Sequence, residues 1–159
     1  MANLTFITVG SLKEGYLREA VAEYKKRLSQ YAKTEEIELK EERIANEDNR
    51  TEIEAALSKE ADKILAAIPK DAYKIALCVE GKQYSSEELA RLIGDGCDRS
   101  GKIAFIIGSS YGLSEKVKRE CDLKLSFSKL TFPHQLMKVV LFEATYRSFT
   151  ILAGKRYHK

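Results

Sequence analysis

The sequence predicts an α/β fold with a mostly parallel sheet of about five strands and helices on its faces. Two continuous apolar runs without alternation, Ile75–Val79 and Ile103–Ile107, are typical of strands buried on both faces. A helix between them begins at a predicted capping box, Ser85 to Glu88, and supplies the crossover that a right-handed parallel pair requires. With 159 residues, 44% hydrophobic and 32% charged, the chain is expected to form one soluble domain over residues 1–159.

Two strands and a helix are expected before this pair. Leu4–Val9 alternates between apolar and polar residues and is rich in β-branched side chains, which is typical of a strand. Ser11 and Glu14 have the spacing of a capping box and predict that the first helix begins there. Glu35–Leu39 is expected to form a second strand at the edge of the sheet.

The segment after the edge strand is charged. Lys40–Asn49 has little to bury and is expected to form a mobile surface loop. Asn49 and Glu52 predict the capped start of another helix, and Pro69 predicts its end, because proline cannot continue a helix.

The C-terminal part of the chain contains an unusual helix. A short helix capped by Ser114 and a strand at Lys124–Phe127 lead into the loop Phe127–Phe132, and Pro133 is expected at the first position of the last helix. Apolar residues lie on nearly every side of this helix, which is typical of a buried helix. Because one sheet covers only one side, we expect a second copy of the protein on the other side and hence a homodimer.

Three strands of the predicted sheet end in polar or glycine-containing loops, Val79–Gly81, Gly108–Gly112 and Phe127–Phe132. Ligands of open α/β sheets bind beyond the carboxyl ends of parallel strands, so we expect one pocket where these loops meet. The phosphate-binding motifs G-x-x-x-x-G-K-[ST] and G-x-G-x-x-G are absent, which argues against nucleotide triphosphates and dinucleotides. A ligand held by backbone amides and apolar contacts is expected instead.

Polar residues of the last helix and the C-terminus have two interpretations each. His134, in the first turn, is either a capping or packing residue or a catalytic or RNA-contacting one. Glu143 and Arg147, four positions apart, form either an ordinary helix pair or a partly buried pair placed for function. The basic segment Gly154–Lys159 is either a solvated tail or a site that binds a phosphate backbone and stacks on an unpaired base.

The composition argues against several other classes of protein. A net charge of +3 is too small for the overall field to indicate a polyanion partner. Cys78, Cys97 and Cys121 lie far apart with no histidine at ligand spacing, so we expect reduced thiols, no metal site and a cytoplasmic location. No segment has the length and apolar character of a membrane span or of a signal peptide, so no membrane association is expected.

Three stretches of the chain carry a resemblance to a known family. They are ITVGSLKEGYLREAVAEYKKRL, FIIGSSYGL, and LSFSKLTFPHQLMKVVLFEATYRSF with the closing YHK. Together they resemble the RlmH family of SPOUT methyltransferases, whose members methylate N3 of a pseudouridine in 23S ribosomal RNA, within assembled ribosomes, using S-adenosylmethionine. The resemblance implies a SPOUT-type α/β sheet with a C-terminal trefoil knot, and a homodimer.

The resemblance also implies where the cofactor binds. The residues expected to contact it are Leu77, Gly108, Phe127, Ser128, Lys129, Leu130, Thr131 and Phe132. One position departs from the family pattern, because Ser109 stands where a second glycine is common. A side chain there is expected either to narrow the pocket or to add a hydrogen bond.

Methyl transfer to N3 requires that the imide proton leave before or during the attack, with help from a general base that the sequence does not identify. The candidates near the target are His134, Glu143 with Arg147, and Tyr157 and His158 of the tail. We expect the tail residues to reach the site of the partner subunit. Two alternative functions stay open: a ribosome-binding or RNA-binding protein that has lost the cofactor, and a methyltransferase of the same fold that acts on ribose 2′-hydroxyls.

Overall fold

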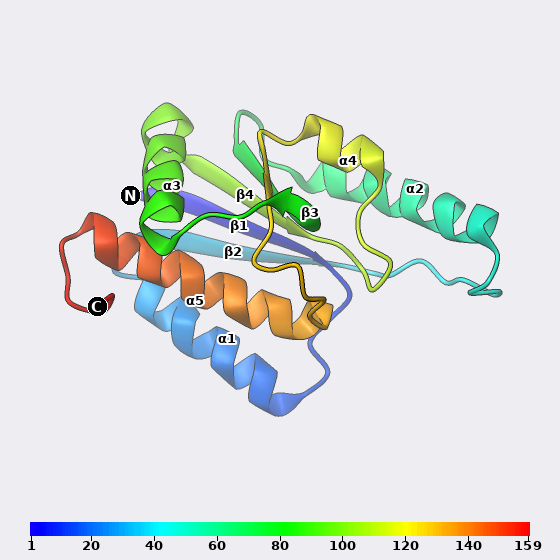
Figure 1. Ribbon diagram of the computed structural model, residues 1–159, viewed down its shortest axis with the longest axis horizontal. Coiled ribbons are helices and arrows are strands. Elements are labelled where there is room, and N and C mark those ends of the chain that lie inside the picture. The colour runs from blue at the N-terminus through cyan, green and yellow to red at the C-terminus, as the bar shows by residue number, and fades with distance from the viewer.

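The computed structural model describes residues 1–159 and contains five strands and five helices (Figure 1). In chain order they are β1 (Ala2–Val9), α1 (Gly15–Leu28), β2 (Ala32–Leu39), α2 (Arg50–Ala67), β3 (Tyr73–Lys82), α3 (Ser86–Ser100), β4 (Lys102–Ile107), α4 (Glu115–Glu120), β5 (Leu123–Leu125) and α5 (His134–Leu152). All strand pairs are parallel and their order is β2-β1-β4-β3-β5. The predicted fold class is confirmed, and β2 lies at the edge as expected. The trefoil knot stays a prediction.

Helices cover both faces of the sheet. α1, α3 and α5 lie on one face and α2 and α4 on the other (Figure 1). Successive residues of a strand point to opposite faces, so Leu4 and Phe6 of β1 pack with α1, α3 and α5, whereas Ile7 and Val9 pack with α2 and α4. The sheet is therefore buried on both sides, as the apolar runs predicted.

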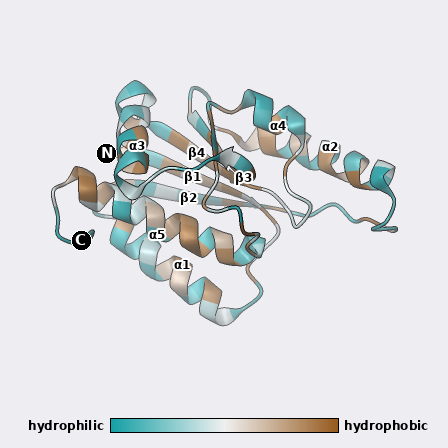
Figure 2. Cartoon of the chain, in the orientation of Figure 1, coloured by the Kyte–Doolittle hydropathy of each residue, from teal (hydrophilic) through white to brown (hydrophobic).

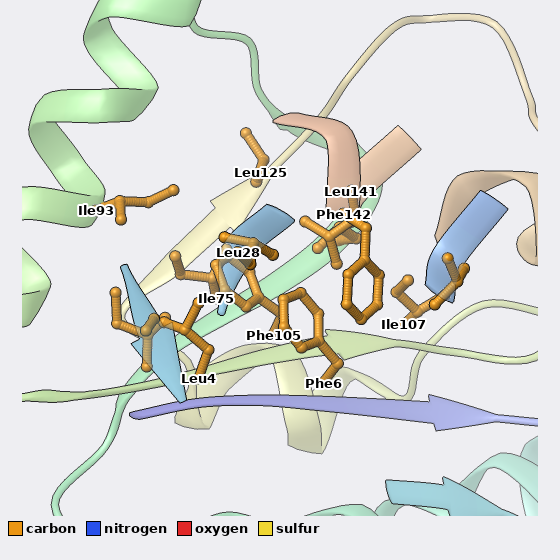
Figure 3. Close-up of a cluster of buried hydrophobic side chains, with 14 of the residues drawn as sticks. Leu4, Phe6, Leu28, Ile75, Ile93, Phe105, Ile107, Leu125, Leu141 and Phe142 are labelled. Carbon is orange, nitrogen blue, oxygen red and sulfur yellow. The ribbon is translucent and has the colours of Figure 1, made fainter. Parts of the chain in front are cut away.

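The larger core lies between the sheet and α5. Phe6 stacks on Phe105, with 5.0 Å between ring centroids, and on Phe142 of α5, with 4.0 Å (Figure 3). Figure 2 shows brown, hydrophobic bands along α5. Both α1 and α3 also contact α5, so the chain itself covers part of the surface that was expected to meet a second copy. Leu136 remains 39% exposed, and the homodimer stays a prediction.

The predicted starts of α2 and α3 are confirmed, but the predicted start of α1 is wrong. The Asn49 side chain accepts from the Glu52 N–H, and Ser85 and Glu88 form a complete capping box. α1 instead begins at Gly15 and has no side-chain cap. In the non-helical segment before it, the carbonyl oxygens of Leu12 and Lys13 accept from the Arg18 guanidinium, at 3.0 and 2.7 Å.

Three predicted boundaries near the strand ends also shift. Pro133 is the N-cap of α5 rather than its first residue, and its carbonyl accepts from the Met137 N–H at 2.9 Å. β5 covers Leu123–Leu125 because the chain then turns away, with the Ser126 N–H donating to the Lys82 oxygen. β3 continues past Gly81, where a β-carbon would lie 2.7 Å from the Lys124 oxygen, so this glycine permits two strands to approach closely.

None of the helices combines the length and the apolar character that crossing a membrane requires. No group of three or more His, Cys, Asp and Glu side chains is arranged to hold a metal ion.

Candidate functional site

The three segments predicted to meet do so, around a cavity of about 260 Å³, but the first of them, Val79–Gly81, lies within β3 rather than in a loop after it. Seven of the eight residues expected to contact a cofactor line it, namely Leu77, Gly108, Phe127, Ser128, Leu130, Thr131 and Phe132. Lys129 is exposed and is not part of the lining. Among the polar candidates, only His134 borders this cavity.

The loop after β4 needs both of its glycines. The Gly112 N–H donates to the Ser109 oxygen at 2.9 Å, which folds Gly108–Gly112 into a tight turn. Gly112 has a φ of +86°, a conformation that L side chains rarely adopt. A β-carbon on Gly108 would collide with the backbone of Gly112 and with Leu113. These glycines therefore let the loop turn back tightly at the wall of the cavity.

The loop after β5 is held by its own side chains. The Ser126 hydroxyl donates to the Ser128 oxygen, and the Ser128 hydroxyl accepts from the Leu130 N–H, both at 3.0 Å. Leu130 is 71% exposed at the rim of the cavity. This loop leads into the N-terminus of α5, whose first N–H groups have no helical partners.

The polar side chains of the cavity largely neutralise one another. Lys118 of α4 forms an ion pair with Glu80, and this hydrogen bond is the main reason that the pKa of Glu80 lies below its ordinary value. Burial opposes the charge on Lys118, but Glu80 and Glu115 raise its pKa overall. Burial also raises the pKa of the Cys78 thiol. The cavity thus offers backbone groups and apolar surface with little net charge.

The other four predicted catalytic residues form a second cluster near the C-terminal end of α5. Glu143 accepts from Arg147 Nε at 3.0 Å and Nη2 at 2.5 Å, and from the Tyr157 hydroxyl at 3.0 Å. Arg147 lies over the Tyr157 ring at 4.7 Å and contacts His158 Nδ1 at 3.1 Å. His158 Nε2 reaches Glu87 of α3 at 2.8 Å. We call Glu143, Arg147, Tyr157 and His158 the tail cluster.

The tail cluster is ordered by these contacts, so Tyr157 and His158 are half-buried rather than frayed. Burial and the hydrogen bond to Glu143 raise the pKa of Tyr157 to about 12. The hydrogen bond to Glu143 raises the pKa of Arg147 as well. At neutral pH, Tyr157 is therefore a hydrogen-bond donor rather than a proton acceptor. The Glu143–Arg147 pair, for which two interpretations were open, belongs to a network of four side chains.

The cavity borders the N-terminal end of α5, whereas the tail cluster involves its C-terminal half. Arg147 follows His134 by 13 positions, which corresponds to about 20 Å along a helix. The structure therefore separates His134 from the other four predicted catalytic residues within one chain.

Sequence reasoning missed Lys118 and Cys78 as part of the cavity. Cys78 could have been predicted, because it directly follows Leu77, which was itself expected to contact the cofactor. Lys118 had no signal, because only the packing of α4 brings it to this edge of the sheet.

The chain is similar to known proteins over almost its full length. A family described as "Predicted SPOUT methyltransferase" matches residues 2–158. Proteins called ribosomal RNA large subunit methyltransferase H are similar over nearly their whole length: that of Shouchella clausii is 50% identical over 99% of both chains, and that of Clostridium novyi 51% identical over 99% of both. The protein of that name from Caldicellulosiruptor bescii is 49% identical over 98% of this chain and 99% of its own.

A solved structure shares the fold at much lower sequence similarity. It is a probable methylase family protein from Haemophilus influenzae Rd KW20, 14% identical, with a TM-score of 0.57. The match covers 98% of this chain and 70% of that one.

Proposed function

The chain belongs to the SPOUT methyltransferase family, and we propose that it transfers the methyl group of S-adenosylmethionine to N3 of a pseudouridine in 23S ribosomal RNA of the assembled ribosome. One observation carries the proposal furthest: three segments that are far apart in sequence converge on one cavity, which is lined by seven of the eight residues expected to hold the cofactor. The names of the relatives support a ribosomal RNA substrate.

The cavity fits a cofactor of this chemistry. Eleven of its 21 lining residues are hydrophobic, and its volume of about 260 Å³ is close to the roughly 300 Å³ at which small-molecule pockets begin. Leu77, Phe127 and Phe132 would pack against the apolar parts of the cofactor, and the turn at Gly108 would bring backbone groups close to it. When bound, S-adenosylmethionine supplies an electrophilic methyl group on a sulfonium.

The protein's own contribution is to orient the nucleotide and to assist removal of its N3 proton. Holding two reactants in the reactive geometry is worth roughly 7–11 kcal/mol, and a general base adds on the order of 10²–10⁴-fold. We propose that Arg147 orients the target nucleotide through its guanidinium, while Glu143 and Tyr157 fix that guanidinium in place. His134 borders the cavity, so it is the candidate that would lie nearest a methyl donor bound there.

We propose further that the active centre forms between two copies of the chain. Within one chain about 20 Å of α5 separate the cavity from the tail cluster, so a second copy would be needed to bring an Arg147 to the cavity. The exposed apolar side chains near the cavity support this arrangement: Val79 is 50% exposed and Leu136 39%. The solution mass from sedimentation equilibrium tests it.

The product nucleoside tests the proposed reaction. Ribosomes from cells that lack this modification are incubated with the protein and S-adenosylmethionine carrying a deuterated methyl group, and the 23S RNA is digested for mass spectrometry. A labelled methyl group on the base of a pseudouridine is expected. A label on ribose identifies a 2′-O-methyltransferase. No label, together with no heat of S-adenosylmethionine binding, identifies a binding protein without the cofactor.

A further inference from the structure

One ion pair lies in the wall of the cavity. Lys118 of α4 and Glu80 of β3 are the only Lys, Arg, Asp or Glu residues that line it, and their side chains pair through Nζ and Oε1. The Lys118 side chain is 12% exposed and the Glu80 side chain 57%, so the cation lies deeper than the carboxylate. The apolar side chains and backbone groups described above account for a ligand held by shape, and they give this pair no role.

A bulge in β3 brings Glu80 to the cavity. Leu125 of β5 pairs with both Leu77 and Lys82, so the four residues between these two are pushed out of the strand ladder. Bulges are common beside active sites, where they redirect a side chain. Gly81 permits this one, because a β-carbon there would collide with the backbone of β5. The carboxylate therefore reaches the cavity through a specific irregularity of the backbone.

α4 brings the cation to the same place. Val117, next to Lys118, is completely buried against the sheet and anchors the helix. An ammonium group has three N–H donors, and the structure shows two acceptors for Lys118, namely Glu80 and, at 3.4 Å, Glu115. The Oε2 atom of Glu80 accepts no hydrogen bond from another residue. Both groups therefore keep hydrogen-bonding capacity for a ligand.

Both groups are charged at neutral pH. The hydrogen bond from Lys118 is the main reason that the pKa of Glu80 is lowered. Burial opposes the charge on Lys118, but Glu80 and Glu115 raise its pKa overall. Glu80 would repel a ligand with only negative charge, and Lys118 one with only positive charge. The pair is complementary to a ligand group that carries both charges side by side, as an α-amino acid does.

We infer that Lys118 and Glu80 bind the amino-acid end of S-adenosylmethionine, with Lys118 Nζ donating to its carboxylate and Glu80 accepting from its ammonium group. This inference rests on the proposed function, because it assigns the cavity to that cofactor, and it adds which end of the molecule faces α4. The ion pair between the two side chains need not break, since positive and negative charges alternate in the resulting group of four. Hydrogen bonds between charged groups are stronger than those between neutral ones.

Three thioethers that differ at this end test the inference by calorimetric titration. S-adenosylhomocysteine carries both charges, its decarboxylated form only the ammonium group, and methylthioadenosine neither. Lys118→Met removes the cation and keeps the apolar stem. It is expected to weaken binding of S-adenosylhomocysteine roughly tenfold, the size of one hydrogen bond to a charged group, and not to weaken binding of the other two compounds.

Glu80→Gln tests the other half of the pair. It is expected to weaken binding of S-adenosylhomocysteine and of its decarboxylated form, and to leave methylthioadenosine unaffected. Because Glu80 is largely exposed, this variant carries the test even if Lys118→Met does not fold. Lys116→Met is the matched control: Lys116 lies on the same helix and forms an exposed ion pair with Asp62 outside the cavity, so none of the affinities should change.

Two results would overturn the inference. One is an equal loss of affinity for all three compounds in either variant, because a pair that only braces the wall does not distinguish the ends of a ligand. The other is unchanged affinity for S-adenosylhomocysteine in either variant. In both cases, binding of S-adenosylmethionine to the unaltered protein leaves the proposed function in place. If the unaltered protein binds none of these compounds, S-adenosylmethionine included, the proposed function is overturned and this inference with it.

Discussion

The two ends of α5 are built in different ways. At the N-terminal end the cavity is shaped by backbone: the tight turn at Gly108–Gly112, the close approach at Gly81 and a loop closed on its own hydroxyls. At the C-terminal end the tail cluster consists of long side chains that share hydrogen bonds around Glu143. The first arrangement suits the recognition of one small molecule by shape, and the second suits the orientation of a larger polar substrate.

This comparison predicts that changes at the two ends affect different steps. Variants of the tail cluster should change methylation while cofactor affinity stays the same, and variants of the cavity should change cofactor affinity itself. A tail-cluster variant with altered cofactor affinity, or a cavity variant with unaltered cofactor affinity, would contradict this division.

Arg147→Ala is expected to have the largest effect. Loss of the guanidinium removes the group that we propose orients the target, so methylation should fall by roughly 10²–10³-fold, as for the loss of a preorganised donor. Binding of S-adenosylmethionine, measured by calorimetry, should not change. Arg50→Ala is a matched control, because Arg50 forms the same kind of i,i+4 pair with Glu54 at an exposed site. A fully active Arg147→Ala protein would contradict the assignment.

Gly108→Ala is expected to have the next largest effect, at the other end of α5. The added β-carbon collides with Gly112 and Leu113, and overpacking of this kind typically costs about 1–3 kcal/mol. Cofactor affinity should fall by about 10–100-fold, together with a lower melting temperature. Gly15→Ala, where the nearest atom is 3.7 Å away in the flexible Arg18 side chain, provides the control. Normal affinity in Gly108→Ala would show that the turn does not shape the site.

Deletion of Tyr157–Lys159 should reduce modification of ribosomes by about 10–100-fold, which corresponds to the loss of about 1.4–2.8 kcal/mol of base stacking and associated contacts. The fold and the affinity for the cofactor should persist, since these residues pack against the surface of α5 and α3. Circular dichroism and calorimetry check the two expectations. Weaker cofactor binding after the deletion would contradict this expectation. It would mean that the tail lies close to a cofactor cavity, although about 20 Å of α5 separate the two within one chain.

The smallest effects are expected in the dependence of stability on pH, first at Glu60 of α2, which is 4% exposed. Burial raises the pKa of Glu60 from its ordinary 4.5, so above that value the unfolded chain loses the proton before the folded one does. The folded state then becomes progressively less favourable as pH rises towards the raised pKa. Glu60→Gln removes this penalty, and its stability relative to the unaltered protein should increase from pH 4 to pH 8 in urea unfolding.

Tyr157→Phe provides the contrasting case for the tail cluster. Because the pKa of Tyr157 is raised to about 12, its contribution is complete below the ordinary value of about 10 and is lost only as pH approaches 12. The difference in stability between this variant and the unaltered protein should therefore stay constant between pH 5 and pH 9. A difference that varies within that range would mean that another group titrates in the cluster.

Sequence reasoning predicted the cavity better than the tail cluster. Glycines and short polar loops at the ends of apolar strands are local features, and the carboxyl ends of parallel strands meet for general reasons. The partners of Tyr157 were not predictable in this way, because they depend on how the tail folds back over α5 towards Glu87 of α3.

The sequence by itself determined the α/β class, the parallel β3–β4 pair, the edge position of β2, and the two cavity loops that follow β4 and β5. Hydrophobic periodicity and helix capping act over a few neighbouring residues, so the chain alone contains this information. Only the tertiary structure decided that Gly81 lies within a strand, that Lys118 borders the cavity, and that Tyr157 folds back to donate to Glu143. Each of these features depends on which segments, distant in the sequence, pack together. The local sequence does not specify that packing.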